Sequence, residues 1–387
     1  MRIGIVAPEF PPDIGGVETY AHEFSLELAR RGHEVFVFTC PHPNGEISGQ
    51  GFEVLPILKV QYTSDRQLPQ KYPMDVWHVM NAAYSWLALE TQPLIMSVHG
   101  NDFIDPYFLP RLPNLSHIPG LWRLSLPLRP LRRWLWRKTA LRLMRRGLSH
   151  ATQVITNSEY TKKLLSLRYP DTEGKTSVGY VGVGEDFFRT VDRRGSKDKT
   201  KRLVTVCRLA EPRKNVDKIL RSLARLKHYP FQYTLIGDGN LRFDLESLCR
   251  QLDLDQRVTC TGFLPKTEIQ KILAESDLFV LASAVLPDSI EGFGIVYLEA
   301  NACGTPVLAA RAAGAAEAVN EGKTGYFVDE PTVPAITAAL ERFLKGEIHF
   351  QRADCKAFAN RFNWAKVVDH AMQFYLSGQR EKTFSIT

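Results

Sequence analysis

The sequence predicts an α/β protein with two Rossmann-like domains, each built on a parallel sheet. Two observations support this fold class. Short apolar runs, typical of buried strands, alternate with helical patterns through both halves of the chain. The chain has 387 residues, which is long for one domain but suits two domains that each bury a full core. We expect the two sheets to face each other across a cleft.

The first half of the chain begins with a strand, a glycine-containing loop, a helix and a second strand. Residues 3–7 are an apolar run, and Gly15 and Gly16 lie in the loop that follows it. Residues 17–31 have helical periodicity. The further strands expected in this half lie at residues 35–39, 76–80, 94–99 and 153–157.

A polar stretch without periodicity, residues 181–201, is expected to be a linker between the halves. We therefore place one domain at residues 1–185 and the other at 200–360. Residues 361–387 are predicted to form a helix that crosses back to the first domain and ends in a loose tail. The strands expected in the second half lie at residues 203–207, 233–236, 258–261, 278–282 and 307–309.

Composition limits the cellular setting. The chain has no run of 18 apolar residues that would span a membrane, and its start lacks the form of a signal peptide. The six cysteines are scattered without paired or zinc-binding spacing, so we expect reduced thiols in a cytoplasmic protein. The net charge of +7 is moderate, and its distribution along the chain matters more than its size.

The most informative motif is a glycine–aromatic–glycine turn, Gly292, Phe293 and Gly294, between two acids, Glu291 and Glu299. The glycines allow the backbone to turn tightly and approach a ligand. The helix that follows would direct its free N–H groups and positive dipole end at a pyrophosphate. Either acid would then accept hydrogen bonds from sugar hydroxyls. A helix start with an acidic first turn accounts for either glutamate alone.

Other polar residues follow the ends of expected strands, where doubly wound sheets bind their ligands. His99 lies at the C-terminal tip of the strand at 94–99, beside a glycine and two polar residues, an unusual setting for a core histidine. We expect it to bind a sugar hydroxyl or the reacting centre. Gly15 and Gly16 are predicted to approach a phosphate or a sugar, although a simple turn explains them equally well.

Two cations, Arg208 and Lys214, follow the first strand of the second half. They suit a diphosphate leaving group, whose negative charge grows in the transition state. Arg208 is expected to bind bidentately and Lys214 as a point charge. The alternative is a solvated helix entry, the setting that we expect for Arg213.

Three further positions are candidates for a base pocket: Gly237, Gly262 and Phe263. Each follows a strand of the second half, so its backbone groups would lie at the ligand-binding edge. Turns alone explain these residues nearly as well.

Taken together, these motifs resemble the retaining glycosyltransferases of family 4, which share the GT-B fold of two Rossmann-like domains and use nucleotide-activated sugars. The resemblance extends over nearly the whole chain. It rests on six segments, in this order: FPPDIGGVETY, SVHGND, VCRLAEPRKNVDKIL, LIGDGNLRFDLE, TGFLP and the Glu-x7-Glu run of Glu291 and Glu299.

The resemblance implies that Glu299 holds the ribose, that Glu291 holds the donor sugar, and that His99 contacts that sugar. It also implies transfer with retention at the front face, without a protein nucleophile and without a metal ion. The departing phosphate would help to deprotonate the acceptor hydroxyl. The separation of Glu291 and Glu299 on a turn and helix does not by itself place two carboxyls face to face, as a glycosidase needs. The phosphate-binding context of the two acids leads us to reject that pairing.

The resemblance further implies that Arg208 and Lys214 hold the diphosphate, with Gly16 close to it. The spacing between the two cations is one residue longer than the usual pattern. The Lys-Asn-Val-Asp context favours Lys214 over Arg213.

A basic stretch lies outside these motifs. No acidic residue occurs between Asp105 and Glu159, whereas arginine, tryptophan and leucine are frequent there. Basic amphipathic helices with tryptophan favour anionic membrane surfaces. A solvated helix face or a contact with another polyanion would also account for the charge, while no nucleic-acid-binding module is recognisable. The residues expected to contact the membrane are Arg129, Arg132, Arg133, Trp134, Trp136 and Arg137.

The function expected from all of this is a retaining, metal-independent hexosyltransferase at the inner face of the membrane. Its donor would be a GDP- or UDP-sugar, with no separate cofactor, and its acceptor a lipid-linked sugar or polysaccharide of the cell envelope. Two alternatives stay open: an epimerase or hydrolase of the same fold that acts on the sugar nucleotide, and a non-catalytic binding protein that keeps the fold.

Overall fold

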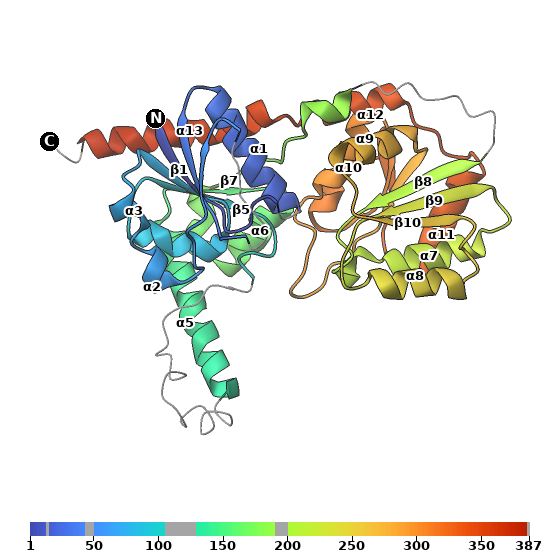
Figure 1. Cartoon of the computed structure of the whole chain (residues 1–387), viewed down its shortest axis with the longest axis horizontal. Coiled ribbons are helices and arrows are strands. Elements are labelled where there is room, and N and C mark those ends of the chain that lie inside the picture. Colours follow the sequence, from blue (N-terminus) through green and yellow to red (C-terminus); the bar gives the residue numbers. More distant parts are fainter. Residues whose placement is uncertain (13–14, 43–49, 105–128, 190–199, 385–387) are drawn as a thin grey trace. The chain divides into compact units, whose positions relative to one another are not determined.

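The computed structural model describes residues 1–12, 15–42, 50–104, 129–189 and 200–384, without the side chains of 129–133 and 378–384. The chain divides into two compact units. Unit 1 comprises Met1–Tyr180 and Ala365–Thr387, and unit 2 comprises Val181–Trp364. Each unit contains one parallel sheet with helices on its faces, as the alternating sequence pattern predicts (Figure 1).

The sheet of unit 1 has seven strands in the order β3-β2-β1-β4-β5-β6-β7. Strands β1 to β3 are added toward one edge of the sheet and β4 to β7 toward the other. The loop after β1 therefore lies at the switch point, between β1 and β4, where such sheets bind ligands. Two of its strands, β3 and β7, are only three residues long and were not predicted. The strands are β1 (Arg2–Val6), β2 (Glu34–Phe38), β3 (Glu53–Leu55), β4 (Val76–Val79), β5 (Leu94–Val98), β6 (Gln153–Thr156) and β7 (Thr176–Val178).

The helices of unit 1 include a C-terminal one, α13, that returns from the far end of the sequence. Arg31 donates to Asp369 at 2.6 Å and to the Ala365 carbonyl at 2.8 Å, and His370 and Ser177 lie 2.8 Å apart. These contacts attach α13 to unit 1. The helices are α1 (Gly16–Arg30), α2 (Tyr62–Asp65), α3 (Leu68–Lys71), η1 (Ala82–Leu89), α5 (Arg129–His150), α6 (Glu159–Arg168), η3 (Pro170–Lys175) and α13 (Trp364–Phe384).

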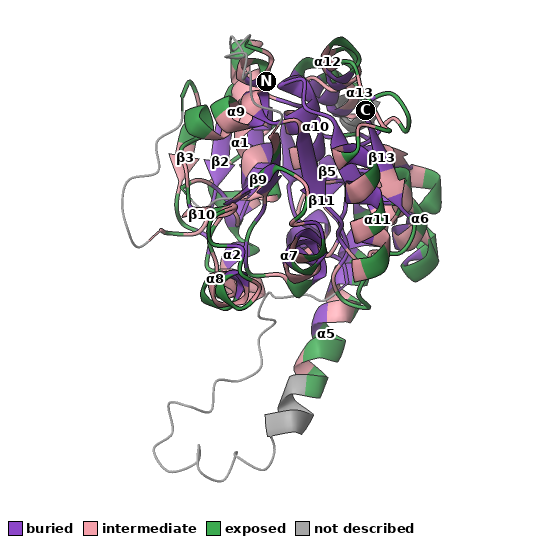
Figure 2. Cartoon of the chain, turned by 90° about the vertical axis from the view of Figure 1, so that its right-hand side faces the viewer, coloured by how far each residue is buried: buried purple, intermediate pink, exposed green. Residues whose placement is uncertain are grey.

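Helix α5 is attached to unit 1 by its C-terminal half. Ala140, Met144 and Leu148 are buried at helical spacing against η1. Gly147 is required at the closest approach, since a Cβ there would lie 2.3 Å from the Ser85 carbonyl carbon. The N-terminal half of α5 extends away from the sheet of its unit and is largely exposed where its side chains are described (Figures 1 and 2).

The sheet of unit 2 has six strands in the order β10-β9-β8-β11-β12-β13. Its switch point lies between β8 and β11, and these two strands precede the predicted cation pair and the Glu-x7-Glu run. Strand β13 was not predicted. The strands are β8 (Lys201–Val206), β9 (Phe231–Ile236), β10 (Val258–Gly262), β11 (Leu278–Leu281), β12 (Val307–Ala310) and β13 (Gly325–Val328).

The helices of unit 2 cover both faces of its sheet, with α7, α8 and α11 on one face and α9, α10 and α12 on the other (Figure 1). The buried residues concentrate in the strands between these layers (Figure 2). The helices are η4 (Glu185–Phe188), η5 (Pro212–Lys214), α7 (Val216–Arg225), α8 (Arg242–Gln251), α9 (Lys266–Glu275), α10 (Ile295–Ala302), η6 (Ala313–Glu317), α11 (Val333–Leu344) and α12 (Arg352–Ala359).

The predicted linker covers residues 181–201. Its first part, residues 181–189, belongs to unit 2. Val183 and Phe187 are buried, and the Val183 N–H donates to the Phe362 carbonyl at 2.9 Å. This part of the linker prediction is therefore wrong, because a short polar segment with a few apolar residues can complete a core without any periodicity. Residues 190–199 lie outside the described part of the chain.

Candidate active site

The centre of the charged cluster in unit 2 is Glu291, which follows β11 and is only 9% exposed. One carboxylate oxygen, Oε2, accepts hydrogen bonds from Lys214 at 2.6 Å and from Ser283 at 3.1 Å. It also accepts one from Arg213 at 2.8 Å. Burial by itself would raise the pKa of Glu291, but the charges of Lys214 and Arg213 outweigh it and lower the pKa to about 2. The carboxylate is therefore ionised at neutral pH.

Arg213 does not lie in a solvated helix entry, so that expectation was wrong. It is 6% exposed, and its guanidinium donates to Ser289 at 3.0 Å as well as to Glu291. Its remaining arm pairs with Glu211. Burial would lower the pKa of Arg213, but Glu291 and Glu211 raise it above the ordinary value. Arg213 is thus the structural cation that balances the buried glutamate.

Lys214 lies beside Arg213 and pairs with the same carboxylate. Of the two predicted diphosphate-binding cations, Lys214 is thereby mostly buried against Glu291, whereas Arg208 is exposed at the end of β8. The sequence order Arg-Lys does not indicate which side chain turns inward. In the structure, the side chains of Arg213 and Lys214 both turn inward and donate to the same oxygen, Oε2 of Glu291.

A left-handed turn holds this loop against the sheet. Asn215, with φ of 54°, ends the 3₁₀ turn η5 and precedes α7, and its side-chain amide donates to the Ala282 carbonyl at 2.7 Å. The Ala284 N–H donates to the Arg213 carbonyl at 2.7 Å. Asparagine tolerates this backbone conformation better than most residues because its short side chain hydrogen-bonds locally. The loops after β8 and β11 are in this way tied together.

The predicted glycine–aromatic–glycine turn leads into α10. Gly294 has φ of 87°, and a Cβ at this position would lie 2.4 Å from the Tyr297 ring, so only glycine fits. Glu299 lies on the second turn of α10 and is half-buried. The Phe293 side chain is 1% exposed and packs at 5.8 Å from the Phe362 ring. Its side chain therefore belongs to the core, which leaves only its backbone for donor binding.

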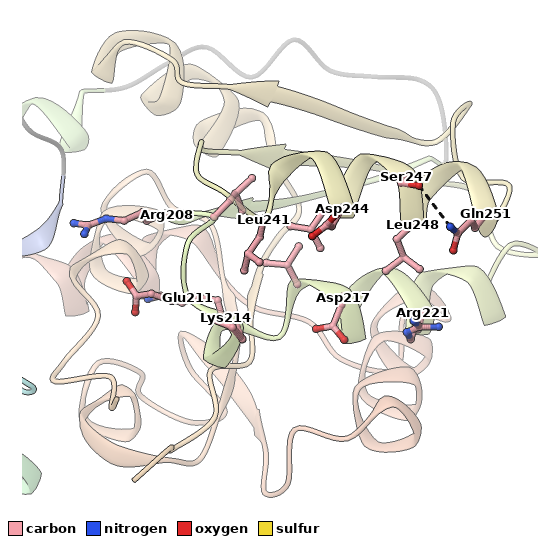
Figure 3. A pocket seen from close by; sticks show the side chains of 14 residues that line it. Arg208, Glu211, Lys214, Asp217, Arg221, Leu241, Asp244, Ser247, Leu248 and Gln251 are labelled. Carbon is pink, nitrogen blue, oxygen red and sulfur yellow. Dashed lines mark hydrogen bonds between the residues drawn. The ribbon is translucent and has the colours of Figure 1, made fainter. Parts of the chain in front are cut away.

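A pocket of about 420 Å³ adjoins this cluster and extends between α7 and α8. Arg208 and Lys214 line one end, and the leucines of α8 line its floor (Figure 3). Asp217 and Asp244 face it from the two helices (Figure 3). The pocket thus shares Lys214 and Glu211 with the Glu291 cluster, and Arg208 lines the pocket from outside that cluster.

The three predicted base-pocket residues lie at the ends of β9 and β10: Gly237 follows β9, Gly262 is the last residue of β10, and Phe263 follows it. A Cβ on Gly237 would lie 1.9 Å from the Cys207 carbonyl oxygen, and one on Gly262 would lie 2.5 Å from the Arg242 guanidinium. Close backbone packing thus explains Gly237, and a left-handed backbone with φ of 72° explains Gly262. Phe263 is 57% exposed, which is unusual for an aromatic ring beside a tight turn.

In unit 1, His99 follows β5 at the carboxyl edge of the sheet. Its ring lies 4.3 Å from the Tyr20 ring, and its Nε2 is buried without a hydrogen-bond partner among the described residues. Burial lowers the pKa of His99 to about 3, so the ring is neutral at pH 7. Asp102 accepts from the His99 N–H at 3.1 Å and from the Ala82 N–H at 3.0 Å, which holds the loop in place.

A buried hydrogen-bond chain that the sequence did not indicate leads from α13 toward this histidine. His78 lies 2.5 Å from the Tyr375 hydroxyl through Nδ1 and 2.9 Å from the Ser97 hydroxyl through Nε2. Ser97 in turn lies 3.3 Å from the Tyr20 hydroxyl. Burial, followed by the proximity of His99, lowers the pKa of His78 to about 3. Periodicity places His78 in a strand but does not reveal its partners.

The two predicted glycines of unit 1 lie at the start of α1. Gly15 precedes α1, and its carbonyl accepts from the Thr19 N–H at 3.0 Å, while Gly16 is the first residue of the helix. Both lie at the switch point between β1 and β4, as expected from the loop's place in the sequence.

The described side chains of the basic stretch lie on α5. Trp134 is 51% exposed, Trp136 is half-buried and Arg137 is exposed. The Lys138 ammonium lies 3.7 Å from the centre of the Trp134 ring, a cation–π contact. Arg145 pairs with Asp171 at 3.1 Å, so part of the positive charge is balanced. The side chains of Arg129, Arg132 and Arg133 lie outside the described residues.

The described residues contain neither a metal-binding cluster nor a membrane-spanning helix. No group of histidine, cysteine, aspartate or glutamate side chains gathers there in a way that would hold a metal ion. None of the helices in that part of the chain is long and apolar enough to cross a membrane.

The fold and the charged cluster define a class. Two parallel Rossmann-like sheets, each in a unit of its own, are the architecture of GT-B glycosyltransferases. The family model described as "Glycosyltransferase Family 4" matches residues 14–187, and the model "Glycosyl transferases group 1" matches residues 187–362. The chain therefore belongs to the group 1 glycosyltransferases and is similar to family 4, which confirms the predicted fold and family.

Three relatives illustrate the similarity. The chain is 27% identical to a GDP-mannose-dependent alpha-(1-6)-phosphatidylinositol monomannoside mannosyltransferase of Mycolicibacterium smegmatis, over 97% of this chain and 98% of the relative. Its fold matches HepE of Anabaena in complex with UDP and glucose, with a TM-score of 0.70, 19% identity, and coverage of 96% and 98%. It also matches sucrose-phosphate synthase from Thermosynechococcus elongatus, with a TM-score of 0.73, 20% identity and full coverage of both chains. These relatives identify the chain as a nucleotide-sugar glycosyltransferase.

Proposed function

We propose that this glycosyltransferase moves a hexose, with retention of configuration, from a UDP- or GDP-sugar to a lipid-linked or polysaccharide acceptor of the cell envelope. The observation that carries the proposal is the buried Glu291 carboxylate, held ionised between Lys214 and Arg213 at the end of β11. It lies just ahead of the Gly294 turn and the N-terminus of α10, where free N–H groups favour an anion.

The ionisation of Glu291 supports a role in orientation. A general acid of the glycosidase kind needs a raised pKa, whereas the pKa of Glu291 is lowered to about 2. One oxygen of the carboxylate is already occupied by three protein donors. The other oxygen is suited to accept hydrogen bonds from hydroxyls of the transferred sugar.

Arg208 and Lys214 would stabilise the diphosphate as its bond to the sugar breaks and its negative charge grows. A phosphate oxygen would accept the proton of the acceptor hydroxyl, so the new glycosidic bond forms on the face from which the diphosphate leaves. Glu299 would bind the ribose, while Gly16 and the backbone of Gly292 and Gly294 would approach the phosphates. With cations of the chain in this place, we propose that the reaction needs no metal ion and no cofactor.

The base pocket would include the backbone of Gly237 and Gly262 together with the exposed ring of Phe263. An aromatic ring stacks on any base, so Phe263 by itself does not distinguish UDP from GDP. The mycobacterial relative is named for GDP-mannose, whereas HepE is named as a complex with UDP. Both donor classes therefore have to be tested.

The acceptor proposal depends on α5, whose exposed face carries Trp134, Arg137 and Lys138. Tryptophan beside cations on a helix suits an anionic membrane surface, which would bring the enzyme to a lipid-linked acceptor at the cytoplasmic face. The relative from Mycolicibacterium smegmatis is named as acting on a phosphatidylinositol mannoside, an acceptor of this kind.

The decisive test offers UDP-glucose and GDP-mannose to the full-length protein, with and without membrane-derived acceptors. We expect a glycosylated product only when acceptor is present, with the donor's anomeric configuration preserved by NMR and with unchanged rate in EDTA. Sugar nucleotide that is hydrolysed or epimerised without acceptor would instead support the alternative enzyme class. An inverted product would contradict the retaining mechanism, and binding without turnover would support a non-catalytic protein.

The membrane proposal has its own test in vesicle sedimentation. The wild type should sediment with vesicles of phosphatidylglycerol and phosphatidylcholine but not with phosphatidylcholine alone. The double variant Trp134→Ala/Arg137→Gln should sediment markedly less. Arg145→Gln is the matched control, since Asp171 already balances that arginine. Equal sedimentation with both vesicle types, or none, would remove membrane contact from the proposal.

A further inference from the structure

Two buried polar atoms at the carboxyl edge of the sheet in unit 1 have no hydrogen-bond partner among the described residues. One is Nε2 of His99, and the other is Oδ1 of Asn157. Buried side-chain polar atoms are nearly always hydrogen-bonded in native proteins, so each exception requires an explanation. The His99 ring is part of the site predicted from the sequence, but Asn157 was not singled out there.

The two residues occupy equivalent places on neighbouring strands. Strands β5 and β6 are parallel, and Val98 pairs with Thr156 as the last matched residues of the ladder. His99 and Asn157 follow them directly, and the Asn157 N–H donates to the Val98 carbonyl at 3.3 Å. The two unpartnered atoms therefore belong to adjacent chain segments at one edge of one sheet.

The local structure holds Asn157 firmly. It is 6% exposed and comes just before Ser158, whose side chain accepts from the Thr161 N–H at 3.0 Å and caps α6. A comparable asparagine, Asn81, follows β4 and uses its Oδ1 to accept from the Ala83 N–H at 2.8 Å. Asn81 thus uses its amide oxygen locally, whereas the Oδ1 of Asn157 has no partner among the described residues. The Oδ1 of Asn301 in unit 2 also lacks one, but the Asn301 amide donates to the Thr305 carbonyl at 2.9 Å.

The chemistry of the two atoms selects a neutral, hydroxyl-bearing ligand. An amide oxygen only accepts hydrogen bonds, so its ligand must supply a donor. Ionised phosphate oxygens are acceptors, and they would be repelled by Oδ1. Neighbouring hydroxyls of a hexose can donate to Oδ1 and exchange a further hydrogen bond with the neutral imidazole.

We propose that Asn157 is a sugar-binding residue, which together with His99 binds hydroxyl groups of a hexose at this edge of unit 1. The proposal rests on the proposed glycosyltransferase function and names a residue of its site. The hexose is either the one that the donor carries or one of the acceptor, and both offer the same hydroxyl chemistry. The loss of a hydrogen bond from a neutral hydroxyl is expected to weaken binding by roughly three- to tenfold.

The test compares three variants of the full-length protein. Asn157→Leu removes the oxygen at similar volume, and Asn157→Asp keeps an acceptor at the same position. Thr156→Val is the matched control, because the Thr156 hydroxyl already donates to the Ser158 carbonyl at 3.2 Å. Calorimetry measures affinity for UDP, GDP, UDP-glucose and GDP-mannose, and initial rates give the KM for the acceptor.

If the hexose belongs to the donor, Asn157→Leu should bind the nucleotide sugar several-fold more weakly and the free nucleotide as well as the wild type does. If it belongs to the acceptor, donor affinity should stay constant and the acceptor KM should rise. Asn157→Asp should retain more of the affected affinity than Asn157→Leu. Unchanged donor affinity together with an unchanged acceptor KM in Asn157→Leu would overturn the proposal. A wild type that binds none of these nucleotides would instead contradict the proposed function.

Stability gives a readout that does not depend on any substrate. Because Oδ1 lacks a protein partner, Asn157→Leu should leave the denaturant midpoint unchanged or raise it, as removal of an unpaired buried acceptor does. Asn81→Leu should lower the midpoint, since it breaks the bond to the Ala83 N–H. A fall in the midpoint of Asn157→Leu as large as that of Asn81→Leu would show that Asn157 is structural and would overturn the proposal.

Discussion

Both units place polar groups at the carboxyl ends of their strands but satisfy them differently. In unit 2, the buried Glu291 is balanced by two cations, and Arg213 is in turn paired with Glu211. In unit 1, His99 and Asn157 at the edge are neutral, and one polar atom of each lacks a partner among the described residues. A buried charge must be neutralised inside the protein, whereas a neutral polar atom left without a partner costs much less.

This difference is consistent with the proposed function. In that proposal, the charges already in place in unit 2 would stabilise a phosphate group electrostatically. In unit 1, Nε2 of His99 and Oδ1 of Asn157 are neutral atoms without partners among the described residues, and sugar hydroxyls would supply the hydrogen bonds that they lack. The comparison leads to four predictions, given from the largest expected effect to the smallest.

The largest effect is expected from Arg213→Met. Removal of the guanidinium leaves Glu291 with one cation fewer and Glu211 without its partner, which should lower the free energy of unfolding by about 3 kcal/mol. Urea denaturation measures it. The control is Arg311→Met, whose exposed pairs with Glu321 and Asp329 should contribute less than about 1 kcal/mol. Equal losses in the two variants would mean that the charged cluster is not a buried network.

Acid should destabilise unit 2 through Glu291. Its pKa is lowered from 4.5 to about 2, so the unfolded chain binds more protons and stability falls as the pH drops from about 4.5 to 2. The stabilising contribution of the ionised carboxylate is about 3 kcal/mol; it is fully present above pH 4.5 and is lost as the pH falls toward 2. Glu291→Gln should flatten this part of the pH–stability curve. A curve as steep in the variant as in the wild type would contradict the assignment.

A smaller effect is expected from Tyr375→Phe, which tests the neutral network of unit 1. The variant removes the hydroxyl that lies 2.5 Å from His78 and should cost about 1 kcal/mol of unfolding free energy. Tyr326→Phe in unit 2 is the matched control, since that hydroxyl donates to the Ala339 carbonyl at 3.0 Å. If the network positions His99, only Tyr375→Phe should also lower the rate of sugar transfer. A stability loss without any kinetic effect would limit the network to a structural role.

The smallest stability effect is expected from Phe263→Ala. Because the ring is 57% exposed, the melting temperature should change by less than the equivalent of about 0.5 kcal/mol. Affinity for UDP or GDP, measured by calorimetry, should nevertheless fall several-fold if the ring stacks on the base. Phe293→Ala is the contrasting variant, since its buried ring should cost stability first. Unchanged nucleotide affinity in Phe263→Ala would remove this ring from the base pocket.

Much of the fold was predictable, because period and length determine which segments form strands and helices. The three missed strands, β3, β7 and β13, are three or four residues long. Such segments are too short to show a period, and they pair at the edges of sheets that other strands have already built. The same limit explains why residues 181–189 were taken for a linker.

The site was predicted less completely. The positions of Arg208, Glu291 and His99 after predicted strands placed them at the carboxyl edges of the sheets, because parallel strands all end at the same side of a sheet. The sequence did not show that Arg213 turns inward beside Lys214, since the left-handed Asn215 that ends their turn is recognised only in the folded loop. Nor did it distinguish Phe293, in the core, from Phe263, at the surface, although each follows a glycine.

The sequence by itself determined the class of this protein: the alternating pattern specifies two parallel sheets, and the ordered motifs specify a group 1 glycosyltransferase. These are properties of local spacing and composition. Only the tertiary structure decided the partners of the polar groups, namely the cations around Glu291, the hydrogen-bond chain from Tyr375, and the unpartnered oxygen of Asn157. Burial and pairing depend on segments that lie far apart in the sequence, and folding alone brings those segments together.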